Sequence, residues 1–454
     1  MAFLDEAYLL ETDAARTLYD GIADRPIVDP HTHADVAEIV DNEGWDDIWE
    51  AEASTDHYVW ALMRNRGIDE ELITGDASNR EKWNALAAVF PTFAGNPTYE
   101  WVHLDLKRRF GIETPISAET ADEIWNETKA QLEEPAMRPQ PLLREMGVEV
   151  VASTDDPTSA LEYHERAVDE VSGVDVVPTW RADRALTVDR AAFGDFVADL
   201  EDATGIEADE FAGFLEALSA SHDYFAKRGC RATDLSVRQP VSRPVDEQRA
   251  RAVYETALAE EPVTDRDVAD FQAFLLEYVG ELNAEKGWVT QLHLGPVRNY
   301  RDAVYDRVGP AGGGDVSAGD VELTDSLEYL LNRLDGETPI VLYALDPTQY
   351  PAIATMARVF PNVSIGPAWW FNDSPFGMEH QLEYAGTVEL LYEHAGMVSD
   401  SRKLLSYGSR FEMFRRSLAN VVGRQVERGQ MPMDVARDLV ERLAYERPNK
   451  LYGF

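Results

Sequence analysis

Two histidines one residue apart, His31 and His33, are the residues of this sequence best suited to bind a metal ion. They end a short apolar run, and alternate residues of an extended strand point the same way, so both imidazoles can reach one divalent cation. Two such histidines can equally be ordinary hydrogen-bonded side chains. Asp400 is the carboxylate that can complete the ligand set, although it can instead cap the helical stretch that follows it. A mixed histidine and carboxylate shell suits zinc, manganese or iron(II), and zinc is our first expectation.

Cations and aromatic side chains follow other apolar runs of the chain. Arg181 and Arg402 offer guanidinium forks for a carboxylate or phosphate, while a salt bridge to a neighbouring acid is an equally reasonable role for each. Trp369 and Trp370 can present a stacking face to a sugar or can pack beneath a loop. His293 can act as a further metal ligand or as a hydrogen-bond donor to a substrate.

The elements that must position these residues form a regular pattern. Eight short apolar runs end in polar residues, and most are rich in Val and Ile, as strands buried on both faces are. They span residues 26–31, 148–154, 174–180, 229–234, 288–293, 339–345, 363–368 and 397–400. Longer segments with helical periodicity separate most of them. This alternation predicts a parallel (β/α)₈ TIM barrel, whose active site gathers at the C-terminal ends of the strands.

One interval is too long to be a simple connection between two barrel strands. Residues 35–146 separate the first two runs and have helical periodicity almost throughout, which predicts a helical insertion after strand 1 that contributes to the pocket. Residues 1–34 and 147–454 then form the barrel. Residues 193–227 predict a smaller helical elaboration, and the Gly-rich segment 309–315 predicts a surface loop.

The charge balance restricts the possible partners of the chain. Its 454 residues include 84 acidic and 41 basic side chains, a formal net charge of −43, which should repel nucleic acid and anionic membranes. Seven of the basic residues are lysines, and none follows a middle run, so a single metal ion is expected rather than a pair bridged by a carbamylated lysine. The acidity and the scarcity of lysine predict adaptation to high salt, and an acidic surface for a binding partner is the alternative. A single cysteine, Cys230, and an acidic start without a signal peptide predict a cytoplasmic protein.

Taken together and in this order, the motifs resemble the uronate isomerase (glucuronate isomerase) family of the amidohydrolase superfamily. The resemblance runs nearly end to end. Its main motifs are Pro30-His31-Thr32-His33, Asp56-His57-Tyr58, Pro178-Thr179-Trp180-Arg181, Gln291-Leu292-His293, Trp369-Trp370-Phe371-Asn372-Asp373 and Asp400-Ser401-Arg402.

The resemblance implies an aldose–ketose isomerase that converts glucuronate to fructuronate, or galacturonate to tagaturonate, by metal-assisted C2–C1 proton transfer through an enediol. It implies one divalent metal held by His31, His33 and Asp400. The candidates for proton transfer are Asp400, Tyr58 and His57. The expected substrate contacts are Arg181, Arg402, His293, Trp369, Trp370 and Asp234. The expected partners are a small sugar acid and further copies of the chain.

The chain departs from the family pattern at two places. Leu235 stands where a histidine usually follows the aspartate, and Tyr407-Gly408-Ser409-Arg410 replaces the usual Tyr-x-Arg-His-Glu. Both departures bear on substrate preference and activity. A mononuclear metal-dependent hydrolase of the same superfamily and a catalytically silent binding protein are the alternative functions.

Overall fold

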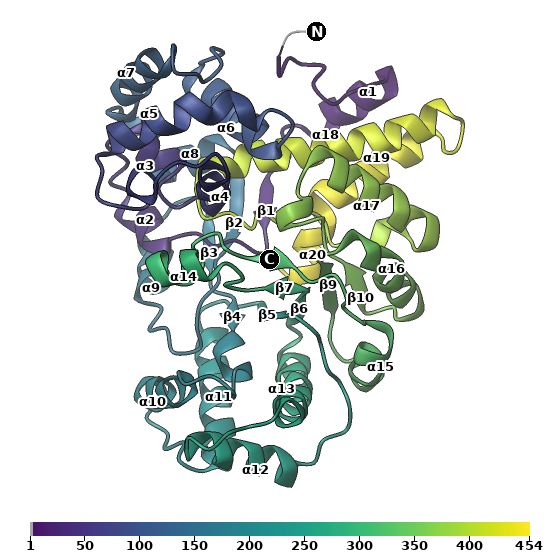
Figure 1. Cartoon of the computed structure of the whole chain (residues 1–454). Helices are drawn as coiled ribbons and strands as arrows, with labels where there is room; N and C mark the ends of the chain where they lie inside the picture. Colours follow the sequence, from purple (N-terminus) through teal and green to yellow (C-terminus); the bar gives the residue numbers. More distant parts are fainter. Residues whose placement is uncertain (1–2) are drawn as a thin grey trace.

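A ring of parallel strands lies at the centre of the computed structural model, which describes residues 3–454 (Figure 1). Seven of the eight predicted runs form strands in this part of the chain, and the third is split in two. They are β1 (Ile27–Asp29), β2 (Val148–Ala152), β3 (Asp175–Val177) with β4 (Trp180–Arg181), β5 (Ala232–Val237), β6 (Val289–Leu294), β9 (Ile340–Ala344) and β10 (Val363–Ile365). Parallel pairing gives the orders β1-β2-β3 and β10-β9-β6-β5-β4.

Two junctions close these sheets into a barrel. Residues 153–155 join 177–181 by backbone hydrogen bonds of 2.9–3.1 Å. On the other side, residues 395–401 run between β10 and β1, with Ala395 N donating to Ile365 O and Asp400 N donating to His31 O. The prediction of a strand over 397–400 is therefore wrong in detail. The segment closes the barrel, but Asp400 has a φ of 49° and interrupts the extended ladder.

The register of the fourth strand also differs from the prediction. β5 begins and ends three residues later than the run 229–234, so Asp234 lies inside the strand rather than at its end. Because side chains alternate along a strand, Asp234 and Leu235 point to opposite faces. Asp234 lies within the barrel, whereas Leu235 packs in the hydrophobic core.

Between β1 and β2 the structure contains helices and no assigned strand. They are α2 (Val36–Asp41), α3 (Ile48–Glu52), α4 (His57–Asn65), α5 (Asn79–Val89), α6 (Pro97–Phe110), α7 (Ala121–Leu132) and α8 (Pro139–Glu145). Local sequence defines their ends: Ser78 and Glu81 form a capping box at α5, and Gly111 ends α6 with a φ of 68°. One hydrophobic cluster runs from Trp83 and Trp101 of these helices to Val151 of the barrel, and the division into barrel and insertion stays a prediction.

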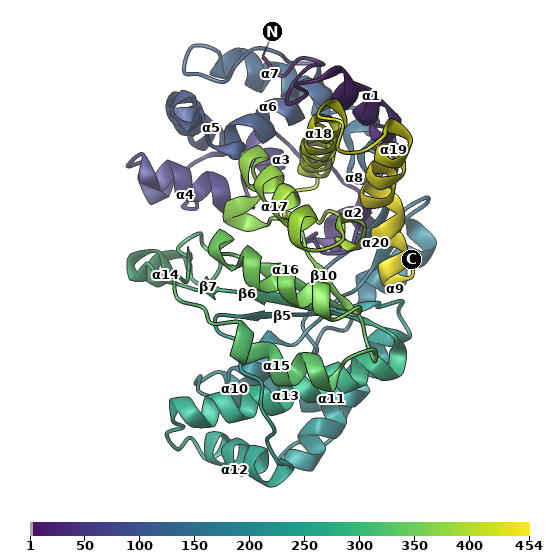
Figure 2. The same ribbon diagram turned by 90° about the vertical axis from the view of Figure 1, so that its right-hand side faces the viewer.

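The remaining helices surround the strands. They include α1 (Asp13–Ile22), α9 (Glu162–Glu170), α10 (Phe193–Thr204), α11 (Phe211–Ala226), α12 (Glu247–Leu258), α13 (Asp265–Lys286), α14 (Asp302–Val308), α15 (Thr324–Arg333), α16 (Tyr350–Val359), α17 (Pro375–Val388), α18 (Ser406–Glu427), α19 (Met433–Glu441) and α20 (Arg447–Tyr452). Helices α10–α13 lie on the opposite side of the strands from α4–α7 (Figures 1 and 2). None of the helices in residues 3–454 is both long enough and apolar enough to cross a membrane.

Candidate active site

His31, His33 and Asp400, far apart in the sequence, converge where β1 ends. Asp400 Oδ1 lies 3.2 Å from His31 Nε2 and 3.2 Å from His33 Nε2. Backbone hydrogen bonds hold the two segments together, because Asp400 N donates to His31 O and His33 N donates to Ser401 O. The positive φ of Asp400 turns the backbone here, a conformation that Asp tolerates better than most residues.

The hydrogen bonds of His33 define its tautomer. The Thr154 hydroxyl donates to Thr32 O at 3.1 Å, so it accepts from His33 Nδ1–H at 2.7 Å. His33 Nε2 therefore directs a lone pair toward the Asp400 carboxylate, and burial lowers the pKa of His33 to about 4, which keeps the ring neutral at pH 7. Two acceptors that face each other are stabilised by a cation between them, so these residues fit a divalent metal ion.

His31, Asp234 and His293 form a second group of potential ligands. His293 Nδ1 lies 2.7 Å from Asp234 Oδ1, and His31 Nδ1 lies 4.0 Å from Asp234 Oδ2. Burial opposes ionisation of Asp234, but Arg181, whose Nη1 lies 2.9 Å from Oδ2, and His293 hold its pKa well below the usual value. A possible metal-binding site therefore exists at the barrel mouth. In the second group, the charge of Asp234 is already balanced by the Arg181 guanidinium.

The two predicted substrate-binding arginines have different surroundings. The Arg181 guanidinium is paired with Asp183 and Asp234, each at 2.9 Å, so it is neutralised by the protein. Arg402 donates to Ala311 O at 3.1 Å and has no carboxylate within ion-pair distance among the described residues. Arg298, which the sequence analysis missed, also lines the pocket and lies 4.7 Å from the centre of the Trp370 ring.

The paired tryptophans are largely buried, with 3% of Trp369 and 4% of Trp370 exposed. Trp369 packs edge to face against His293, with ring centroids 4.6 Å apart. The residues that line the pocket are His31, His33, His57, Arg181, Ser236, His293, Arg298, Asp315, Trp369, Trp370, Asp400 and Arg402. The tryptophans thus combine packing with a small contribution to the pocket wall.

His57 and Tyr58 begin α4, and the side chain of Asp56 caps this helix by accepting from Tyr58 N at 2.8 Å. His57 lines the pocket, and burial together with Arg402 lowers its pKa to about 3. Burial and the nearby Asp373 raise the pKa of Tyr58 well above its usual value, and its hydroxyl donates to Asp373 Oδ2 at 3.2 Å. Tyr58 therefore stays protonated.

Asp373 and Arg410 are functional candidates that sequence reasoning missed. Arg410 Nη1 donates to Asp373 Oδ2 at 2.7 Å, and the same oxygen accepts from Tyr58. Asp373 ends the tryptophan motif and Arg410 ends the segment 407–410 that departs from the family pattern, but neither position indicated contact with Tyr58. Both side chains are buried, so the pair holds the phenol in place.

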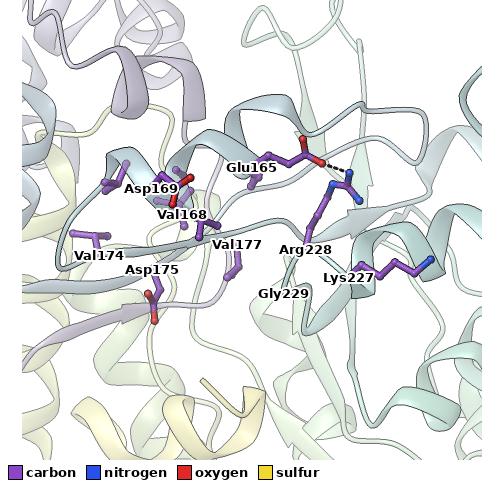
Figure 3. Close-up of a pocket in the computed structure, with 13 residues that line it drawn as sticks. Glu165, Val168, Asp169, Val174, Asp175, Val177, Lys227, Arg228 and Gly229 are labelled. Carbon is purple, nitrogen blue, oxygen red and sulfur yellow. Dashed lines mark hydrogen bonds and ion pairs between the residues drawn. The ribbon is translucent and has the colours of Figure 1, made fainter.

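A separate hollow lies at the N-terminal ends of the third and fourth strands, between α9 and residues 227–229 (Figure 3). Its charged residues include Arg228 and Glu165, which pair with each other. Neither group of potential metal ligands contributes to it. The chemistry that the residues support is therefore concentrated at the opposite, C-terminal ends of the strands.

Comparisons with known proteins agree on one family. A family model described as glucuronate isomerase matches residues 1–452. A uronate isomerase of Thermotoga sp. (strain RQ2) is 54% identical over 450 residues, which cover 99% of each chain. The crystal structure of the Thermotoga maritima uronate isomerase has a TM-score of 0.98 at 53% identity and covers 100% of both chains. That of glucuronate isomerase from Caulobacter crescentus has a TM-score of 0.96 at 26% identity, covering 99% of this chain and 97% of the other.

Proposed function

The chain belongs to the glucuronate isomerase family, an aldose–ketose isomerase family acting on uronates, and on that basis we propose that it interconverts an aldohexuronate with its ketohexuronate. The proposed substrate is glucuronate, giving fructuronate, or galacturonate, giving tagaturonate, or both. The reaction moves a proton between C2 and C1 through an enediol, so it requires a base, an acid and stabilisation of negative charge on oxygen.

His31, His33 and Asp400 are the residues that hold a divalent metal ion in this proposal, with zinc the first expectation and manganese or iron(II) as alternatives. When bound, such an ion polarises substrate oxygens as a Lewis acid. Asp234 and His293, the other members of the second group, lie on the Nδ1 side of the His31 ring and help to orient it. Arg181 keeps Asp234 ionised for that role.

Proton transfer needs one group in its basic form and one that carries a proton, and the pocket offers both. Burial opposes ionisation of Asp400, but the neighbouring His31 holds the pKa of this carboxyl well below its usual value, and burial keeps His57 neutral at pH 7, so both groups are in the basic form. Tyr58 carries its proton, and Asp373 with Arg410 fixes its position. We assign proton abstraction to Asp400 or His57 and hydrogen-bond donation to Tyr58.

Negative charge on the substrate is the second requirement. A uronate carries a carboxylate, and isomerisation develops further negative charge on the oxygens at C1 and C2. Arg402 faces the pocket without a carboxylate partner among the described residues, so it is the guanidinium placed to bind this charge. Arg298, on the face of Trp370 in the same pocket, supplies a second cation, and His293, Trp369 and Trp370 form the wall against which the substrate body packs.

The observation that carries the proposal is the convergence of His31, His33 and Asp400 beside Arg402 in one pocket. The test is incubation of the purified protein with glucuronate and with galacturonate in high salt, with detection of the ketose product and measurement of bound metal. We expect turnover of at least one uronate. A protein that binds a metal stoichiometrically but hydrolyses amides or esters instead would identify the mononuclear hydrolase, and one without either activity would identify a binding protein.

Salt adaptation and location form part of the same proposal. The formal charge of −43 disfavours the compact state in dilute buffer, and molar salt reduces the screening length to about 3 Å. We expect the unfolding midpoint to rise steadily with added potassium chloride, measured by circular dichroism. A midpoint that is the same in dilute and molar salt would contradict this. A cytoplasmic, self-associating enzyme without nucleic-acid or membrane partners completes the proposal.

A further inference from the structure

Lys403 is enclosed by three carboxylates in the interior of the protein. Its Nζ lies 2.6 Å from Glu52 Oε2, 3.4 Å from Asp105 Oδ2 and 3.7 Å from Asp56 Oδ2. The exposed side-chain fractions of the four residues lie between 1% and 4%. A buried ammonium with three buried acids is costly to assemble, so its presence calls for an explanation beyond surface charge.

The three acids come from three different helices of the segment between β1 and β2. Glu52 ends α3, Asp56 caps α4 and Asp105 lies on α6. Lys403, by contrast, follows the segment 395–401 that closes the barrel and carries Asp400. Lys403 therefore connects α3, α4 and α6, through its ion pairs, to the barrel segment that carries Asp400.

Asp56 links this cluster directly to the pocket. One of its carboxylate oxygens, Oδ1, accepts from Tyr58 N at 2.8 Å and so fixes the first turn of α4, on which His57 and Tyr58 stand. The other, Oδ2, faces Lys403. Lys403 in turn is tied to Ser401, whose side chain accepts from Lys403 N at 3.2 Å. A short chain of contacts thus runs from His57 and Tyr58 to the backbone next to Asp400.

We propose that Lys403 is a positioning residue for the isomerisation, which sets the distance between His57 and Tyr58 on α4 and the Asp400 carboxylate. This inference rests on the proposed function, in which groups from both sides act on one substrate. Removal of the ammonium takes away the one cation that Glu52, Asp56 and Asp105 share and so removes the contact that holds their three helices together in a buried space. The first turn of α4 then moves away from the barrel, while the metal ligands keep their own contacts.

The first test is Lys403→Met, with Lys129→Met as the matched control, because Lys129 is an exposed lysine of α7. We expect kcat to fall about 100-fold with little change in KM, since a displacement near 1 Å of a catalytic group has that effect. Bound metal should stay stoichiometric. Hydrogen exchange should become faster in residues 53–65 and stay unchanged in β6. Wild-type kcat together with wild-type exchange in the folded variant would overturn the proposal.

A second variant addresses the case in which Lys403→Met does not fold. Asp56→Asn keeps an oxygen that can cap α4 and removes only the charge that faces Lys403. Asp47→Asn, at the cap of α3 without a lysine partner, is its control. We expect a lower kcat and faster exchange of α4 in Asp56→Asn alone, and equal behaviour of the two variants would refute the proposal. Because hydrogen exchange does not depend on turnover, an inactive wild-type protein would refute the proposed function without deciding the role of Lys403.

Discussion

The barrel mouth contains two histidine–aspartate groups that share His31 but differ in charge and exposure. In the group with His33 and Asp400, 32% of the His33 side chain and 12% of the Asp400 side chain are exposed. In the group with Asp234 and His293, the exposed fractions are 0% and 3%, and Arg181 supplies a cation. By their residue types and geometry, either group could hold a metal ion.

The two groups differ in the charge partners of their carboxylates. Asp234 has both oxygens engaged, one by His293 and the other by Arg181, so its charge is compensated within the protein. Asp400 instead faces the lone pair of His33 and has no arginine or lysine within ion-pair distance among residues 3–454. The proposed metal ion is therefore assigned to the group with Asp400, whose accessible carboxylate lies between two imidazoles, because Asp234 is already paired with Arg181 and His293.

Replacement of Asp400 tests this contrast most directly. Asp400→Asn should lower kcat/KM by at least about 10³-fold and release the metal, because it removes a ligand and a candidate base. The matched variant Asp234→Asn should lose about 10- to 100-fold, the usual effect of a residue that orients a ligand. Kinetics and metal analysis of both proteins provide the comparison. Near-normal activity of Asp400→Asn, or a larger loss in Asp234→Asn, would reverse the assignment.

Arg181 should affect stability more than substrate binding. Arg181→Met leaves the fully buried Asp234 without its cation and should lower the free energy of unfolding by about 3–5 kcal/mol. Arg333, exposed and paired with Glu277 and Glu281 on the surface, is the control, and Arg333→Met should cost about 0–1 kcal/mol. Denaturant unfolding at constant salt measures both. If Arg181 instead binds the substrate carboxylate, the variant will stay stable and its KM will rise.

The pH dependence gives the smallest expected effect. Burial lowers the pKa of His33 to about 4 and, with Arg402, that of His57 to about 3, against about 6.5 in the unfolded chain. The unfolded state therefore binds more protons below pH 6.5, and stability should decrease as the pH falls from there toward 4. Over the same range both histidines stay neutral in the folded protein. We expect the NMR signals of the two rings to show no protonation between pH 7 and about pH 5, and a transition of either ring near 6.5 would contradict its neutral state.

Local patterns were sufficient to predict most of the elements. The apolar runs at 148–154 and 339–345 correspond to β2 and β9, and the helical elaboration predicted over residues 193–227 corresponds to α10 and α11. The run 229–234 gave the wrong bounds for the fourth strand, since β5 begins and ends three residues later. Polar residues such as Asp234 lie inside this strand because they face other side chains within the barrel rather than solvent. The segment 397–400 failed as a strand because the turn at Asp400, which brings its carboxylate to the histidines, breaks regular pairing.

The sequence by itself determined most of the strand and helix order, because local periodicity is enough for that. It also supplied His31, His33 and Asp400 as a candidate ligand set, because each lies at or just after the end of an apolar run. Only the tertiary structure decided which charges compensate one another. It paired Arg181 with Asp183 and Asp234, left Arg402 facing the pocket, and brought Lys403 to acids from three helices. Most of these contacts join segments that are distant in the sequence, with Lys403 and Glu52 separated by 351 residues. Coulomb energies and desolvation follow the distances in space rather than the order of the chain.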